Sequence, residues 1–534
     1  MKTKSNYLLL ATLIGGILFN LMFWSERLAL NLLLYSVFIL SITFFNSEVA
    51  KTKKFKIYAM AHLLAAVMVV VNNSDLSLAT YYISFLLFVG FSHYQSIRSV
   101  WVALMATALQ IIAIPATAFR RLSDLQIGNF KFRPLLRPLK YIILPIIMVF
   151  IFIGIYSGAN AIFEKYASEL GDSIAKILTD VFGFIFNDLS FERFIHFGLG
   201  LALTGGLLIT FYDRVFEKIE LNLNEDLHRN KTKSRIKSLW NEVAEMFMGR
   251  VISKKMALKT EYIVAVISFV ALNFLLLMLN GIDIWWLWLG KGKQLAETNY
   301  AAELHDGTNA LIFSIILAMA IIVYFFRGNL NFYSKSRTLK ILAFAWMIQN
   351  FLLIISVFIR DAHYIEVYGL TYKRIGVIVF AILCIVGLST VYLKIAKQKT
   401  FFYLLKINGN VWYLLLLVFT MVNWDVVIVK YNLAHRETIA FDPDYLLSLS
   451  DKTLPTINQH RRELDLADGN FGSLAPKGTI FIGATNDQLQ LKLDQRIGFF
   501  KERYKRVSWL SWNLQDWNTA KYFGIERLKG ITTL

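Results

Sequence analysis

Charged residues are scarce in this chain. Asp, Glu, Lys and Arg together make up 17% of the 534 residues, whereas 56% are hydrophobic. A water-soluble chain has no way to bury that much apolar surface, while a lipid bilayer offers it an apolar solvent. The composition therefore excludes a soluble enzyme, a disordered protein and a secreted disulfide scaffold.

Cysteine and the familiar catalytic motifs are also nearly absent. The single cysteine, Cys384, lies in an apolar run, which excludes an internal disulfide and a cysteine-rich metal site. The sequence contains no Walker A motif, no G-x-G-x-x-G fingerprint, no HExxH and no G-x-S-x-G elbow. The eight histidines are scattered without metal-ligand spacing. We therefore predict no cofactor and no metal, and we lean against an enzyme without eliminating one.

Negative charge is the scarcer sign, which leaves a formal net charge of +19. Such an excess suggests either a nucleic-acid partner or basic cytoplasmic loops that face anionic lipid. In a chain this apolar we favour the second interpretation. The predicted partner is therefore the lipid bilayer, with no nucleic acid.

Long apolar runs are what the chain has in abundance. A spanning helix needs about 20 mainly apolar residues, or somewhat fewer at the short end. Twelve runs qualify as candidates: 7–24, 28–45, 57–71, 76–91, 100–119, 141–161, 195–211, 262–280, 309–326, 340–358, 375–393 and 411–429.

Basic loops predict the orientation of these runs, because short loops rich in Lys and Arg stay in the cytoplasm. Lys and Arg gather at 51–56, 120–140, 213–259, 327–340 and 394–410. Three runs separate the first two loops, yet two loops on one side require an even number of crossings. We therefore predict that 100–119, which Gln110 and Pro115 interrupt, does not cross. The expected topology is a multi-pass protein of the cell membrane with about eleven spans, a cytoplasmic N-terminus and an exoplasmic C-terminus.

The predicted fold class is all-α, a polytopic transmembrane helix bundle with a small, mainly helical C-terminal domain outside the membrane. Its parts are N-terminal transmembrane helices at 1–161, an exoplasmic amphipathic segment at 162–194, one span with a basic cytoplasmic loop at 195–261, a C-terminal transmembrane bundle at 262–429 and an exoplasmic domain at 430–534. In 234–252 an apolar stripe beside basic residues predicts a helix lying on anionic lipid. Packing of either amphipathic stripe on the protein itself is an equal alternative.

The segment after residue 429 has the composition of a soluble domain. Asp442, Pro443 and Asp444 predict the start of a helix, as N-cap, N1 proline and acidic first turn. A second helix is expected from about residue 485, with one apolar face made of Leu489, Leu493, Ile497, Phe500 and Tyr504. Three tryptophans follow at 509, 512 and 517. They suit a stacked ligand or the membrane interface, but we favour a place in the domain core.

Polar residues inside or at the ends of spans are the remaining candidates for function, since each ionisable group costs about 2.5–3.5 kcal/mol at mid-bilayer. On the predicted topology one exoplasmic cluster contains His305, Asp306, Asn309, Arg360, Asp361, Tyr364, Tyr368, Arg374, Asn423 and Asp425. Gln349 and Asn350 lie near the middle of a predicted span. They form either a substrate or ion site, or pairs and amide bonds that hold helices together. We favour the second interpretation, with Arg374 paired to Asp425.

These same strings resemble a known family. Residues 360–374, RDAHYIEVYGLTYKR, resemble the YGLT-x-x-R core of Domain of Unknown Function family 4173, with its sister family 4153. Further similar strings are His305-Asp306-Gly307-Thr308-Asn309, Asn423-Trp424-Asp425 with Tyr431-Asn432, Asp444-Tyr445-Leu446 and Trp512-Asn513-Leu514. The resemblance covers roughly 260–520. It implies an uncharacterised polytopic membrane protein of bacteria and no particular activity.

Three classes of function follow. The first is a non-catalytic membrane or envelope component whose outer domain binds a protein partner, and we favour it because the motifs are missing. The second is a transporter of small molecules or lipids, which the intramembrane amides and Asp425 favour, although no inverted repeat is visible. The third is a membrane-embedded enzyme on a lipid-linked substrate, with His305, Asp306 and Asp425 as acid and base groups.

Overall fold

The apolar runs form helices, as their composition predicts. The computed structural model describes residues 2–46, 49, 51–94, 96–112, 126–127, 130–131, 149, 152–154, 156–157, 161–182, 191–209, 218, 220–230, 250–252, 255–289, 300–327, 329–333, 335–464 and 486–527. Within these ranges the chain is almost entirely helical. The strands are two short pairs, β1 (Gln126–Ile127) with β2 (Phe130–Lys131), and β3 (His228–Asn230) with β4 (Arg250–Ile252).

One group of helices comes from the N-terminal part of the chain. It contains α1 (Lys2–Phe23), α2 (Leu30–Phe45), α3 (Lys53–Asn72), α4 (Asp75–His93), α5 (Val100–Ile112) and α10 (Phe191–Leu208). Side-chain caps start two of them: Thr52 accepts from Phe55 N at 3.2 Å, and Ser74 and Ser77 form a capping box on α4. The amphipathic segment predicted at 162–194 contains a helix, α9 (Ala161–Phe182), with Tyr166 and Leu170 exposed.

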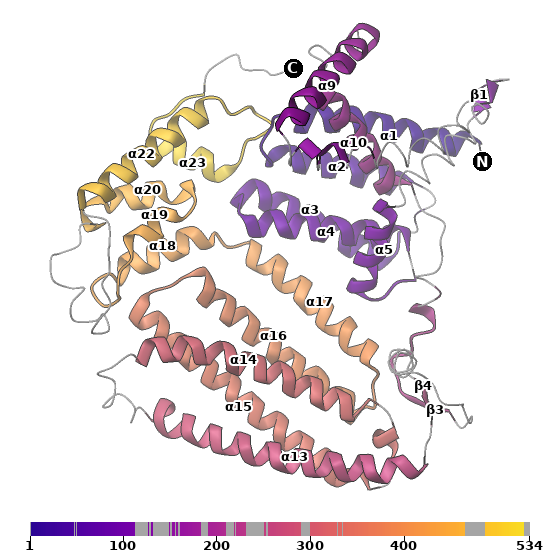
Figure 1. The fold of residues 1–534 in the computed structure, drawn as a ribbon, viewed down its shortest axis with the longest axis vertical. Coiled ribbons are helices and arrows are strands. Elements are labelled where there is room, and N and C mark those ends of the chain that lie inside the picture. The colour runs from indigo at the N-terminus through magenta and orange to yellow at the C-terminus, as the bar shows by residue number, and fades with distance from the viewer. Residues whose placement is uncertain are drawn as a thin grey trace.

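A second group comes from the following part of the chain. It contains α13 (Lys255–Asp283) with the π-helical turn η1 (Ile284–Trp288), α14 (Tyr300–Phe325), the 3₁₀ turn η3 (Asn329–Phe332), α15 (Ser336–Tyr368), α16 (Tyr372–Ala396) and α17 (Phe401–Thr420). In Figure 1 the long helices of both groups run along a similar direction, and α17 lies between the groups. An aromatic stack joins the groups, because Trp101 of α5 lies 5.0 Å from Trp412 of α17 between ring centroids.

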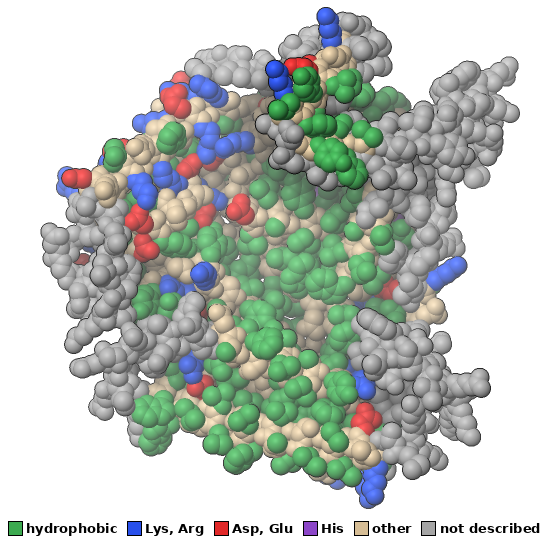
Figure 2. All heavy atoms as spheres, in the orientation of Figure 1, with side chains coloured by type: hydrophobic (Ala, Val, Ile, Leu, Met, Phe, Trp, Pro, Cys, Tyr) green, Lys and Arg blue, Asp and Glu red, His purple; other side chains and the backbone are tan. Residues whose placement is uncertain are grey.

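Among the described residues, six helical segments are long and apolar enough to cross a membrane: Lys53–Asn72, Asp75–His93, Leu258–Trp288, Ser336–Tyr368, Tyr372–Ala396 and Phe401–Thr420. Shorter apolar helices occur at Tyr7–Phe23, Leu30–Phe45, Val100–Ile111 and Asn309–Phe325. Figure 2 shows hydrophobic side chains over the middle of the helices and charged ones gathered over the C-terminal elements. This distribution indicates a multi-pass membrane protein.

The helices that follow α17 lie at one end of the bundle, and we call them the C-terminal domain (Figure 1). They are α18 (Trp424–Ala434), α19 (Pro443–Ser448), η4 (Asp451–Thr453), α20 (Leu454–Gln459), η5 (Arg461–Leu464), α22 (Asn486–Lys505) and α23 (Leu514–Tyr522). Two predictions are confirmed here. Asp442 caps α19 by accepting from Tyr445 N at 3.0 Å, and the whole expected apolar face of α22 is buried.

Three predictions about local structure were wrong. The expected span at 411–429 is two helices, α17 and α18, which part at residues 421–423. The expected loop at 394–410 is only a short turn after α16, because Thr400 caps α17 by accepting from Tyr403 N at 3.3 Å. The end of the expected helix at 234–252 is strand β4, where β-branched Val251 and Ile252 favour extended backbone. Residues 234–249, and most of 120–140 and 141–161, lie outside the described ranges.

The tryptophans of the C-terminal domain also differ from expectation. Trp509 is 56% exposed and Trp517 is 41% exposed, so neither belongs to the domain core. The core is filled instead by the apolar face of α22 and by leucines of α19 and α20. Exposed tryptophans on a domain beside apolar helices fit the interface between membrane and water, where their amphipathic rings are enriched.

Candidate functional site

The turn between α15 and α16 is the centre of the candidate site, and two features of its structure require glycine at position 369. Gly369 has φ +76°, in the left-handed region that L side chains rarely adopt. A Cβ at this position would also lie only 2.4 Å from Oδ1 of Asn432. That close approach lets Asn432 accept from Leu370 N at 2.6 Å and donate to Leu370 O at 3.0 Å. The turn is thus held by one amide side chain of α18.

Arg374 binds the end of the preceding helix. Its Nη1 donates to the carbonyl oxygens of Tyr368, at 2.9 Å, and of Gly369, and its guanidinium carbon lies 4.4 Å from the ring centroid of Tyr364. A cation at a helix C-terminus is stabilised by the helix dipole and by the unpaired carbonyl groups there. Asp361, which is buried, interacts electrostatically with Arg374. Arg374 therefore acts as a C-terminal cap of α15.

Asp425 is the most heavily bonded acidic residue of this region. Its Oδ1 accepts from Tyr372 Oη at 2.6 Å, its Oδ2 accepts from Ser450 Oγ, and Lys452 Nζ lies 3.3 Å from Oδ2. The Asp425 side chain is 9% exposed and that of Lys452 is 5% exposed. Because Asp425 also lies in the first turn of α18, the helix dipole favours its negative charge. The expected pairing of Asp425 with Arg374 was therefore wrong, and its ionic partner is Lys452.

Lys452 continues the network to the N-terminal helices. Its Nζ donates to Asn72 O at 3.0 Å, at the end of α3, while Asn72 Nδ2 donates to Thr420 O at 2.7 Å, at the end of α17. Trp424 Nε1 donates to Phe419 O at 2.9 Å across the break between α17 and α18. The carbonyl groups that this break frees thus gain donors. We call this set (the turn 368–372, Arg374, Asp425, Asn432, Tyr445, Ser450, Lys452 and Asn72) the polar joint.

Tyr445 closes the polar joint from the C-terminal domain. Its hydroxyl oxygen accepts from Tyr372 N at 3.2 Å, at the start of α16. Burial raises the pKa of the Tyr445 phenol, so the group stays neutral and keeps its own proton to donate.

Further bonds fix the C-terminal domain against the turn between α1 and α2. Leu30 N donates to Trp512 O at 3.2 Å and Asn31 N donates to Leu510 O at 2.9 Å. Glu26 accepts from Ser508 Oγ at 2.5 Å, and Gln515 Nε2 donates to Val71 O at 3.0 Å. These bonds join the domain to the first group of helices, and the polar joint joins it to the second group at the same end of the bundle.

Gln349 and Arg360 of α15 belong to a different set of contacts, between α13 and α15. Gln349 Nε2 donates to Asn273 Oδ1 at 2.8 Å, and Asn280 Nδ2 donates to Gln349 O at 3.1 Å. Arg360 forms an ion pair with Asp283, which is buried. Asn350 donates to Trp346 O of its own helix at 2.8 Å. These side chains pack helices together, as amides between spans commonly do.

The structure divides the predicted cluster into four places. It puts Tyr364, Tyr368, Asp361 and Arg374 together, and Asp425 is bonded to Tyr372 of the same turn. Arg360 faces α13 instead. His305, Asp306 and Asn309 lie in the first turns of α14, where Asn309 is exposed and the side chains of the other two lie outside what the structure describes. Asn423 precedes α18, and its Oδ1 is buried with no hydrogen-bond partner among the described residues.

Sequence reasoning missed several members of these sets. Lys452 and Ser450 belong to no motif and lie outside every predicted span, and Tyr372 was noted only as part of the string 360–374. Asn273, Asn280 and Asp283 lie in or just after a predicted span at 262–280, so the same search for polar residues at spans had the signal to find them. Asn432 and Tyr445 were noted as parts of familiar strings without any contact being assigned. Within the described ranges, no group of three or more His, Cys, Asp or Glu side chains is placed to hold a metal ion.

The arrangement of long apolar helices and a bonded polar joint defines the class, a multi-pass helical membrane protein. The chain belongs to the family described as domain of unknown function (DUF4153), whose model matches residues 58–460. This is the family that the sequence suggested as a sister, and the match begins far ahead of the expected 260. It includes every residue of the polar joint and ends before α22 and α23. Searches of curated proteins and of solved structures found no match.

Proposed function

We propose that this chain is a non-catalytic component of the cytoplasmic membrane or cell envelope, whose polar joint holds the outer domain in one orientation for a protein partner. The observation that carries the proposal is the Asp425–Lys452 pair, which is nearly fully buried and bonded on both sides. A carboxylate engaged by Tyr372, Ser450 and Lys452 has little capacity left for a substrate. Removing one member of a buried pair costs about 3–5 kcal/mol, which is consistent with a structural role.

The proposal includes the eleven-span topology, a cytoplasmic N-terminus and an exoplasmic C-terminus. Supporting it, the C-terminal domain lies at one end of the bundle, while Lys399, Lys406 and Arg98 lie with the acidic residues 220–226 at the other end. Contact of 234–252 with anionic lipid, and kinship with the sister family 4173, are further parts of it. A phosphatase fused after Leu534 should be active, and an inactive fusion would overturn the orientation.

The role itself is tested by metabolite and lipid profiling of a deletion strain. If the chain is a scaffold, its deletion should leave no accumulated substrate. When the deletion strain is complemented with the Lys452→Met variant, the purified variant should lack a partner protein that co-purifies with the wild-type chain. An accumulated metabolite or lipid that returns to normal with wild-type protein would contradict a non-catalytic, non-transporting role.

A transporter is the second candidate, because α17 and α18 form a broken helix, and the buried Oδ1 of Asn423 at the break has no partner in the described part of the chain. Broken helices with free polar groups line the binding sites of many transporters. Substrate accumulation in the deletion strain, reproduced by Asn423→Leu in a stably folded protein, would favour this candidate over the first.

A further inference from the structure

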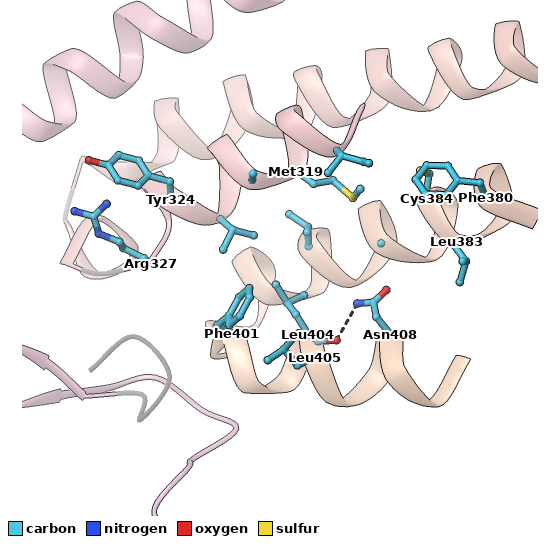
Figure 3. A pocket seen from close by; sticks show the side chains of 15 residues that line it. Met319, Tyr324, Arg327, Phe380, Leu383, Cys384, Phe401, Leu404, Leu405 and Asn408 are labelled. Atoms are coloured by element: carbon cyan, nitrogen blue, oxygen red, sulfur yellow. Dashed lines mark hydrogen bonds between the residues drawn. The ribbon is translucent and has the colours of Figure 1, made fainter. Parts of the chain in front are cut away.

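A groove opens on the side of the second helix group. It lies between α14, α16 and α17 and has a volume of about 610 Å³, within the range of roughly 300–1,000 Å³ that is usual for ligand pockets. Figure 3 shows Met319, Phe380, Leu383, Phe401, Leu404 and Leu405 around it. The lining is almost entirely apolar, and Asn408 uses its Nδ2 on Leu404 O and Thr390 Oγ1, both at 2.9 Å.

The groove has the length of one leaflet. Along α14 it runs from Ile316 to Arg327, and along α16 from Phe380 to Val391. At 1.5 Å per residue each edge is about 16 Å long, roughly half of the ~30 Å hydrocarbon core. It begins at the end of the bundle where α14 and α16 finish and α17 starts, and it ends near mid-helix. The length of the groove therefore matches that of an acyl chain in one leaflet.

A cation stands at the mouth of the groove. The guanidinium carbon of Arg327 lies 3.9 Å from the ring centroid of Tyr324, and both residues line the groove (Figure 3). No carboxylate of the described residues pairs with Arg327. Its neighbours at this end are already engaged: buried Lys394 donates to Phe326 O at 2.7 Å, and Lys399 donates to Asp226 at 2.5 Å. Arg327 is therefore the groove's available anion partner.

We propose that this groove binds one acyl chain of an anionic phospholipid, with the headgroup phosphate on Arg327. The inference rests on the proposed membrane orientation of α14, α16 and α17, which puts the groove in the cytoplasmic leaflet. Charge complementarity selects this occupant, because guanidinium binds phosphate with strong, charge-assisted hydrogen bonds while the apolar lining suits a hydrocarbon chain.

Native mass spectrometry of the full chain in detergent tests the proposal, with phosphatidylglycerol, phosphatidylcholine and inorganic phosphate as probes. We expect phosphatidylglycerol to bind about tenfold more tightly than phosphatidylcholine, because the choline ammonium of the second lipid offsets the charge of the phosphate that Arg327 binds. Arg327→Gln should remove that preference. Arg337→Gln is the matched control, since Arg337 is exposed and does not line the groove.

The groove itself is tested by filling it. Ala320 is exposed and lines the groove, so Ala320→Phe should block both lipids, while Ala310→Phe on an exposed site of the same helix should not. Three outcomes would each overturn the proposal. They are equal binding of the two lipids to the wild type, unchanged lipid binding in Arg327→Gln and Ala320→Phe, and full competition by inorganic phosphate. Dimers that displace lipid would assign the groove to a second copy. None of these outcomes depends on whether the deletion strain accumulates a substrate, so the two proposals fail separately.

Discussion

The two ends of the helix bundle are held by different electrostatics. At the end with the C-terminal domain, the polar joint depends on a pair whose side chains are 9% and 5% exposed. At the other end, residues 220–230 are bound by several shared contacts: Lys406 lies 2.7 Å and Arg98 3.5 Å from Glu225, and Asp226 pairs with Lys399. In each of these pairs, at least one partner has a side chain that is a quarter or more exposed. The first end should therefore depend on single residues, and the second on a network that tolerates losses.

The largest effect is expected at the polar joint. Lys452→Met should lower the free energy of unfolding by about 3–5 kcal/mol, because it leaves Asp425 buried without its cation. Adding Asp425→Leu should recover part of the loss, since an apolar pair leaves no charge buried. Thermal melting in detergent measures both. Lys492→Met is the control, because its pair with Asp444 is exposed; equal losses in Lys452→Met and Lys492→Met would refute the comparison.

A smaller loss is expected in the turn of the same joint. Gly369→Ala should cost about 1–3 kcal/mol for its backbone conformation, and more for the contact with Asn432. In an Asn432→Ala background the added cost should fall, because the contact is gone. Gly376→Ala, where a Cβ meets nothing within 4 Å, is the control and should be neutral or slightly stabilising. Strict additivity of Gly369→Ala and Asn432→Ala would contradict the steric argument.

At the opposite end, Glu220 should give stability a pH dependence. Burial raises its pKa, although bonds from the backbone N–H groups of Arg98 and Ser99 oppose the shift. The folded state then holds the proton more tightly than the unfolded state. Its contribution is therefore present at acidic pH and declines as the pH rises from the ordinary to the raised pKa. Unfolding measured across this interval should show the decline in the wild type but not in Glu220→Gln, and parallel profiles would refute it.

The smallest effect is expected for an exposed pair of the same end. Lys399→Gln removes the partner of Asp226, whose side chain is 56% exposed, so the loss should be below about 1 kcal/mol. The hydrogen bond to Asp226 raises the pKa of Lys399, so the ammonium is charged at neutral pH. High salt should erase the difference between this variant and the wild type, whereas salt should leave the Lys452→Met loss nearly unchanged. A large, salt-independent loss in Lys399→Gln would reverse the comparison.

Much of the fold was predictable because its signals are local. Apolar runs, the Asp442-Pro443 start of α19 and the 3.6-residue spacing of the α22 face each depend on neighbours within a turn or two. The break at 421–423 was not predictable in this way, because it contains no Pro or Gly; it is stabilised by Asn72 and Trp424, of which the first is remote in sequence. The prediction that Trp509 and Trp517 lie in the core was wrong, because the apolar character of a side chain does not determine whether it faces the interior or the surface of a small domain.

By itself, the sequence determined that this chain is an apolar, helical protein of the membrane-spanning kind. It also identified the YGLT turn and Asp425 as polar sites near the ends of spans, which must have a structural or functional role. Only the tertiary structure decided the partners: Lys452 for Asp425, Asp283 for Arg360 and the helix end for Arg374. The physical reason is that helix formation follows from hydrogen bonds and side chains within a few residues, whereas a buried charge is satisfied by whichever donor the packing of distant segments brings within about 3 Å.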